Sequence, residues 1–188
     1  MSFPLITLFS LVCYFIAKKL LSTPKQTFLG LSIALIVMFV LMFKFHGFNT
    51  LAAHISITGC SLVILIVTFI EMSMLEKHMI KIKSGEIGSN VKSVEREYSE
   101  IFILIGIGLA AIILSLISGI LIGTDLELDL IFKFMFTVFA IIIYMVTFLG
   151  IKFANLKIKY AVRGIMLSFS MVLFAYLGNS ILLKTYLS

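Results

Sequence analysis

Apolar residues run along the chain in six long stretches that are separated by shorter polar segments. The stretches cover residues 3–21, 28–43, 51–74, 101–123, 130–151 and 164–183. A bilayer core about 30 Å thick requires about 20 apolar residues of helix, and these stretches approach or exceed that length. Each is apolar around most of its circumference, and in lipid a helix satisfies its own backbone hydrogen bonds. The pattern therefore predicts an all-α, polytopic membrane helix bundle with about six transmembrane helices.

One sizeable polar segment, residues 76–100, interrupts this pattern between the third and fourth stretches. Its two halves carry charges of both signs, and Gly85 and Gly88 lie between them. Glycine next to polar residues is typical of a turn. We expect a hairpin made of two helix extensions around this turn, and we expect residues 1–188 to form a single integral membrane domain.

The composition supports a membrane protein over a soluble one. Of the 188 residues, 61% are hydrophobic and 13% are charged, and the mean hydropathy is +1.19. Soluble domains are about 45–50% apolar and about 25% charged. The two cysteines, Cys13 and Cys60, both lie within apolar stretches. They indicate neither a disulfide framework nor metal-ligand spacing, and the composition excludes an ordinary soluble enzyme.

The net charge of +6 is explained by membrane topology rather than by nucleic-acid binding. Twelve of the fifteen basic residues fall at the end of the first stretch or in the loops after the first, third and fifth stretches. The other three are Lys44, Lys133 and Lys184. Basic loops face the cytoplasm, so both termini are predicted to be extracytoplasmic and the hairpin 76–100 to be cytoplasmic. We expect the lipid bilayer, and no nucleic acid, as a partner.

Small and polar residues line one face of each of the last four predicted helices. The faces are formed by His54, Thr58, Ser61 and Thr68; by Gly108, Ala111, Ser115 and Gly119; by Lys133, Thr137, Ala140, Tyr144 and Thr147; and by Ser168, Ala175 and Asn179. Such residues let membrane helices approach closely and form hydrogen bonds between helices. These faces are predicted to point into the bundle, where Lys133, Tyr144 and Asn179 contribute either to ligand binding or to packing.

Two of these faces carry an ionisable residue about one turn into the helix. An ionisable residue within the membrane is by default a functional hypothesis. His54 is either a hydrogen-bonded structural histidine or a ligand, and His46, in the loop before it, is on the same outer side. Together they could supply two imidazoles to a haem iron. Lys133 has a purely structural alternative. Asp129 lies four residues earlier and can pair with it, and the long lysine side chain can extend to the membrane interface.

Five short segments from the third stretch onward resemble one known family. They are Ala52-Ala53-His54-Ile55-Ser56; Val94-Glu95-Arg96; Ile117-Ser118-Gly119-Ile120-Leu121; the Phe132-Lys133-Phe134 segment with Thr137 and Tyr144; and Arg163-Gly164 with Ala175-Tyr176-Leu177-Gly178-Asn179. In order and spacing they are similar to the cytochrome c assembly transmembrane family of the CcsA/YpjD type, and closer to the YpjD branch.

The resemblance implies a multi-pass protein of a bacterial cytoplasmic (inner) membrane that assists cytochrome c biogenesis or binds and delivers haem. It implies haem as the cofactor, His54 and His46 as haem contacts, and cytochrome c maturation proteins as partners. Members usually have more N-terminal helices, so residues 1–50 correspond to two reduced N-terminal helices and residues 51–188 to a four-helix family-like core. No catalytic constellation is present in the sequence, and we expect a protein without turnover of its own.

Two other functions remain open from the sequence. A non-catalytic scaffold or accessory subunit would use the polar faces only for packing. Haem-handling members carry a tryptophan-rich outer loop, and the absence of tryptophan here agrees with a scaffold. A small metal or solute transporter would use the polar faces as a path across the membrane.

Overall fold

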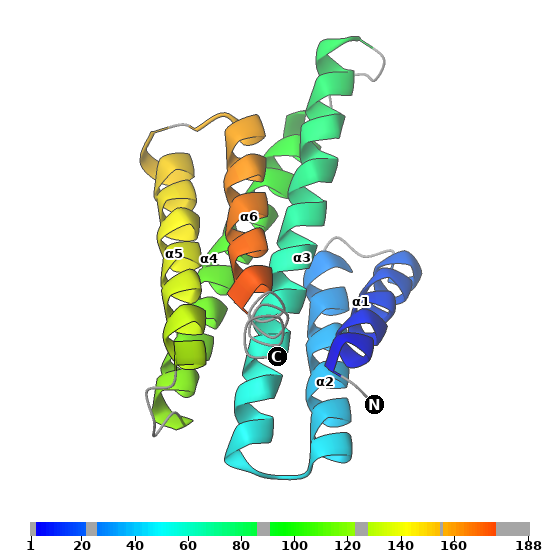
Figure 1. Ribbon diagram of the computed structural model, residues 1–188. Helices are drawn as coiled ribbons and strands as arrows, with labels where there is room; N and C mark the ends of the chain where they lie inside the picture. The colour runs from blue at the N-terminus through cyan, green and yellow to red at the C-terminus, as the bar shows by residue number, and fades with distance from the viewer. Residues whose placement is uncertain (1–2, 22–25, 86–90, 123–127, 155, 176–188) are drawn as a thin grey trace. The chain divides into compact units, whose positions relative to one another are not determined.

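The computed structural model describes residues 3–21, 26–85, 91–122, 128–154 and 156–175 (Figure 1). Within these residues the chain forms helices and no strand. The helices are α1 (Phe3–Leu20), α2 (Gln26–His46), α3 (Thr50–Lys83), α4 (Val91–Ile122), α5 (Leu128–Phe153) and α6 (Ile158–Leu173). The all-α prediction is therefore confirmed for the part of the chain that the structure describes.

Five of these helices, α1 to α5, are long and apolar enough to cross a membrane. They also expose large apolar side chains, for example Leu8 at 60%, Val40 at 58% and Val146 at 64%. An apolar exterior of this extent is unfavourable in water and is what helices facing lipid present. The chain is thus a multi-pass membrane protein by its helices, whereas the sixth span and the side on which the termini lie remain predictions.

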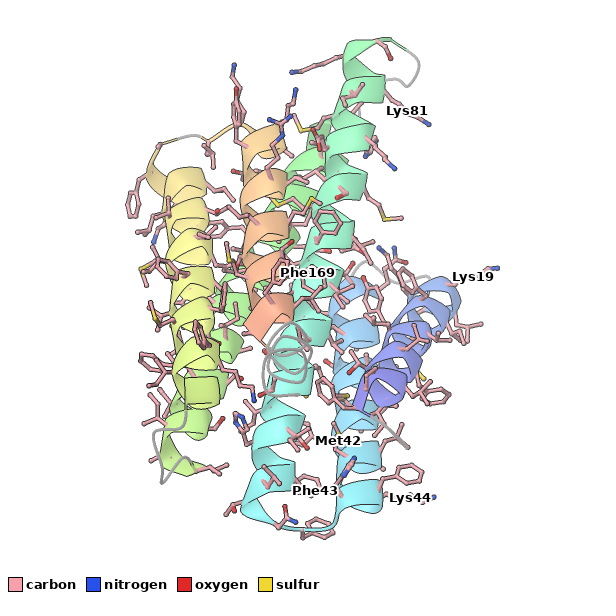
Figure 2. All side chains as sticks on the ribbon, viewed as in Figure 1. Lys19, Met42, Phe43, Lys44, Lys81 and Phe169 are labelled. Atoms are coloured by element: carbon pink, nitrogen blue, oxygen red, sulfur yellow. The ribbon has the colours of Figure 1, made fainter. Side chains whose placement is uncertain are left out.

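The helices divide into two compact units. The first contains α1, α2, α3 as far as Val67 and α4 from Ala111 onward. Here α1 packs along α2, and Lys19 and Lys44 lie at opposite ends of this pair (Figure 2). Gly30 of α2 permits the close approach, because a Cβ atom there would lie 3.3 Å from the Tyr14 ring. Ile6, Met38, Met42 and Cys60 form a buried apolar cluster in this unit.

The second unit contains the rest of α3 and α4 together with α5 and α6. α5 packs along α6, and the Ser168 hydroxyl of α6 donates a hydrogen bond of 2.9 Å to the Ala140 carbonyl of α5. The rings of Phe102 and Phe148 stack at a centroid distance of 4.8 Å. Small and hydroxyl-bearing residues thus lie where these helices meet, as membrane packing favours.

Several helix boundaries differ from the apolar stretches, and α4 begins at Val91, ten residues before its own stretch. α3 continues past its apolar part to Lys83, and a turn with Gly85 at a φ of 77° follows. α6 begins at Ile158, six residues before its apolar stretch, because this segment is amphipathic: Ala161 and Val162 are buried while Tyr160 is exposed. A helix can begin in a polar segment when one of its faces is buried, so apolar stretches underestimate helix length. The single domain and the cytoplasmic location of the hairpin remain predictions.

Candidate functional site

A short connection between α2 and α3 sets the position of His54. Gly47 follows the last residue of α2 with a φ of 76°, and its N–H donates to the Phe43 carbonyl at 3.0 Å. A glycine in this left-handed conformation is a common helix C-terminus. Asn49 then caps α3, because its side-chain oxygen accepts a hydrogen bond of 2.6 Å from the Ala52 N–H. These two local signals start α3 at Thr50 and leave His54 one turn inside it.

The half-buried ring of His54 lies against α4. Its Nδ1 atom is 2.8 Å from the hydroxyl oxygen of Ser118. The next residue, Gly119, leaves room for the ring, since a Cβ atom there would lie 3.2 Å from Cε1 and 3.7 Å from Nε2 of His54. Ser118 therefore bonds to the imidazole, and Gly119 leaves the space that the imidazole occupies.

Two further hydroxyl groups extend this contact along the two helices. The Ser118 hydroxyl donates to the Ser115 carbonyl at 2.9 Å. The Ser115 hydroxyl is 2.8 Å from the hydroxyl of Thr58, one turn after His54 on α3, and both groups are buried. We call His54, Thr58, Ser115 and Ser118 the polar ladder. It joins α3 to α4 within the first unit through side chains of both helices.

The contacts of the polar ladder favour a proton on Nδ1 of His54. A backbone carbonyl can only accept, so the single hydroxyl proton of Ser118 is directed to Ser115. With its proton so directed, the Ser118 oxygen is placed to accept from Nδ1–H of His54. In the neutral imidazole the proton can occupy only one nitrogen, so Nε2 carries a lone pair. Among the described residues, Nε2 has no hydrogen-bond donor.

His46 is the last residue of α2, and its side chain is exposed. Its carbonyl, not its imidazole, takes part in the connection, by accepting a hydrogen bond of 3.4 Å from the Asn49 side chain. No group of three or more His, Cys, Asp or Glu residues that could hold a metal ion occurs in the described part of the chain. Joint ligation by His46 and His54 therefore remains a prediction.

The other predicted residues lie in the second unit. Lys133 is half-buried, one turn and a half into α5, and its carbonyl accepts a hydrogen bond of 2.7 Å from Thr137. Tyr144 is fully buried. Its hydroxyl interacts with the Thr68 side chain but makes no hydrogen bond of standard geometry to a described residue. Asn179 lies outside the described residues, as does the side chain of Asp129.

Ser118 is the residue of this site that the helical spacing did not reveal. The polar face predicted for α4 contains Ser115 and Gly119, and Ser118 lies beside it, three residues after Ser115. A serine next to a glycine, three residues from another serine, was the available signal. His78 also has a partner, since its Nδ1 is 3.2 Å from a carboxylate oxygen of Glu97 in the second unit.

The chemistry that this site offers is that of a single neutral imidazole. Its Nδ1 contacts a hydroxyl group, and with the proton on Nδ1 the lone pair of Nε2 is suited to a metal or haem iron. Comparisons of the chain with protein-family models, with curated proteins and with solved structures gave no match.

Proposed function

We propose that this protein is a haem-handling protein of a bacterial cytoplasmic membrane that assists cytochrome c biogenesis by binding or delivering haem through His54. One observation carries the proposal: the polar ladder leaves the Nε2 lone pair of His54 without a donor among the described residues. The apolar helices support the membrane location, and the resemblance of the segments around His54, Lys133 and Arg163 supports the pathway.

The residues present fit haem by their donor chemistry. Haem iron is often held by histidine, and a ligating histidine normally donates its other ring N–H to a nearby acceptor. His54 has such an acceptor in Ser118. The half-buried ring of His54 retains exposed surface, and His46, whose side chain is exposed, lies at the other end of the α2–α3 connection and could supply a second imidazole. The bound haem would supply the redox-active iron, and His54 would hold it.

The absorption spectrum of protein purified in detergent with haem supplied tests this proposal. We expect a Soret band that titrates with haem, and a loss of at least about tenfold in haem affinity in His54→Ala. His78→Ala is the matched control, because His78 lies in the polar part of α3 and is paired with Glu97. It should bind haem like the parent protein. Absence of a Soret band, or an unchanged titration in His54→Ala, would reject haem binding at this residue.

A scaffold or accessory subunit is the second candidate, and the packing role of the hydroxyl groups favours it. Thr58 and Ser115 contact each other across two helices, and Ser168 bonds to the backbone of a neighbouring helix. A scaffold would co-purify with a specific membrane partner, without a chromophore, and would lose thermal stability in His54→Ala. Protein recovered alone and loaded with haem would contradict this candidate.

A further inference from the structure

We propose that Ser118 is a positioning residue that selects the Nδ1–H tautomer of His54 and so presents the Nε2 lone pair to an incoming metal or haem iron. This inference rests on the proposed function for its purpose, although the tautomer itself can be tested without haem. The juxtaposition is specific, since the His54 Nδ1 to Ser118 oxygen distance of 2.8 Å joins residues 64 positions apart in the sequence.

The selection follows from the direction of two hydrogen bonds. Ser118 is 2.9 Å from the Ser115 carbonyl, which belongs to the backbone of the same helix and cannot donate. If the Ser118 proton pointed instead at His54, the Ser118 hydroxyl oxygen and the Ser115 carbonyl oxygen would lie 2.9 Å apart with no proton between them. Only Nδ1–H on His54 satisfies both contacts, and a hydrogen bond with an unmatched partner is costly in a site shielded from water.

Gly119 leaves the space that the His54 ring occupies beside Ser118. A Cβ atom at this position would lie 3.2 Å from Cε1 and 3.7 Å from Nε2 of His54, so a larger side chain would crowd the ring. Glycine thus makes room for the ring, and the Ser118 hydroxyl bonds to Nδ1. A ligand then meets an imidazole whose Nε2 lone pair already points in a fixed direction. This lowers the entropy that is lost when the ring is ordered on binding.

Three variants separate this role from a general packing role. Ser118→Ala removes the acceptor, and Ser118→Thr keeps a hydroxyl at the same place. Ser170→Ala is the matched control, because Ser170 of α6 donates to the Met166 carbonyl at 2.9 Å and has no ring as a partner. Both alanine variants therefore remove a serine hydroxyl that bonds to the backbone of its own helix. Only Ser118→Ala also removes a hydrogen bond to histidine.

The decisive experiment is nitrogen-15 NMR of haem-free protein with labelled histidine, in detergent micelles at a pH about two units above the usual histidine pKa of 6.5. The chemical shifts of the ring nitrogens distinguish the tautomers, and His46→Gln and His78→Gln assign the signals. We expect His54 to be Nδ1–H in the parent, in Ser118→Thr and in Ser170→Ala, and to shift toward Nε2–H in Ser118→Ala. An Nε2–H signal in the parent, or an unchanged tautomer in Ser118→Ala, would overturn the inference.

Haem titration of the same variants then tests what the tautomer is for. We expect Ser118→Ala to weaken haem binding by about tenfold and Ser118→Thr to restore it, as for other acceptors that orient a ligating histidine. A tautomer shift without any haem binding in the parent would reject the proposed function and support the role of Ser118 in selecting the tautomer. Haem binding by the parent with equal affinity in Ser118→Ala would overturn the positioning role.

Discussion

At the scale of single residues, most hydroxyl groups in the described helices bond to their own helix. The donors Thr7, Ser32, Ser56, Ser73, Thr137, Thr147 and Ser170 each donate to the carbonyl four residues earlier. These bonds satisfy a polar group in an apolar surrounding without a partner helix. Thr58 and Ser168 contact a neighbouring helix, and Ser118 contacts both its own helix and α3. A hydroxyl group in this protein therefore marks an interface only where a neighbouring helix provides a partner.

Tyr144 gives a test at this scale, because its buried hydroxyl has no hydrogen bond of standard geometry among the described residues. A buried polar group without a hydrogen bond lowers the free energy of unfolding by about 1–3 kcal/mol. Replacing tyrosine with phenylalanine removes that group and keeps the shape of the ring. We expect Tyr144→Phe to keep or raise the free energy of unfolding, measured by denaturant unfolding in micelles.

The interaction of the Tyr144 hydroxyl with Thr68 defines the result that would contradict this prediction. A loss of more than about 1.5 kcal/mol in Tyr144→Phe would mean that the two hydroxyl groups form a strong bond. Ser170→Ala provides the comparison, since it removes a hydroxyl group that is bonded only within its own helix.

At the scale of helices, close approach depends on particular small residues. Gly164 of α6 lies so close to α5 that a Cβ atom there would overlap the Thr147 hydroxyl and lie 3.2 Å from its Cγ2. Gly30 has the same role between α2 and α1, facing Tyr14. In lipid, helices associate through packing and hydrogen bonds rather than through exclusion of water, so the distance between backbones has a large effect.

We expect Gly164→Ala to reduce the free energy of unfolding by about 1–3 kcal/mol, because the new methyl group forces α5 and α6 apart. Gly106→Ala is the control: a Cβ atom there would meet only the Phe148 ring, at 3.8 Å, and alanine is a better helix former than glycine. Denaturant unfolding in micelles measures both variants.

Replacing Thr147 with alanine in the Gly164→Ala background should recover part of the loss, since it removes the atoms that overlap. Equal stability of Gly164→Ala and Gly106→Ala would show that the α5–α6 contact tolerates a wider separation.

At the scale of the whole molecule, the apolar exterior indicates contact with lipid, and the unequal distribution of basic residues predicts the orientation in the membrane. Exposed apolar side chains continue along α1, α2 and α5, for example at Leu8, Val40 and Val146. Basic residues gather after the first, third and fifth predicted spans. This distribution predicts a cytoplasmic turn after α3 and an α2–α3 connection on the outer side.

Single cysteines test this assignment, in a background where Cys13 and Cys60 are replaced by alanine. Phe48→Cys lies in the α2–α3 connection and Ser84→Cys in the turn after α3, and both positions are exposed. A maleimide that cannot cross membranes should label Phe48→Cys on intact spheroplasts and should label Ser84→Cys only after lysis. The reverse pattern would invert the topology, and labelling of both before lysis would contradict an odd number of membrane crossings between them.

The sequence by itself was sufficient for the helical class, the apolar stretches and the place of His54 one turn into its helix. These properties depend on local composition and on nearby signals such as Gly47 and Asn49, which act over a few residues. Only the tertiary structure brought the Ser118 hydroxyl to 2.8 Å from Nδ1 of His54, because these two residues lie 64 positions apart in the sequence. Many residue pairs share suitable helical spacing, and packing alone selects which of them meet.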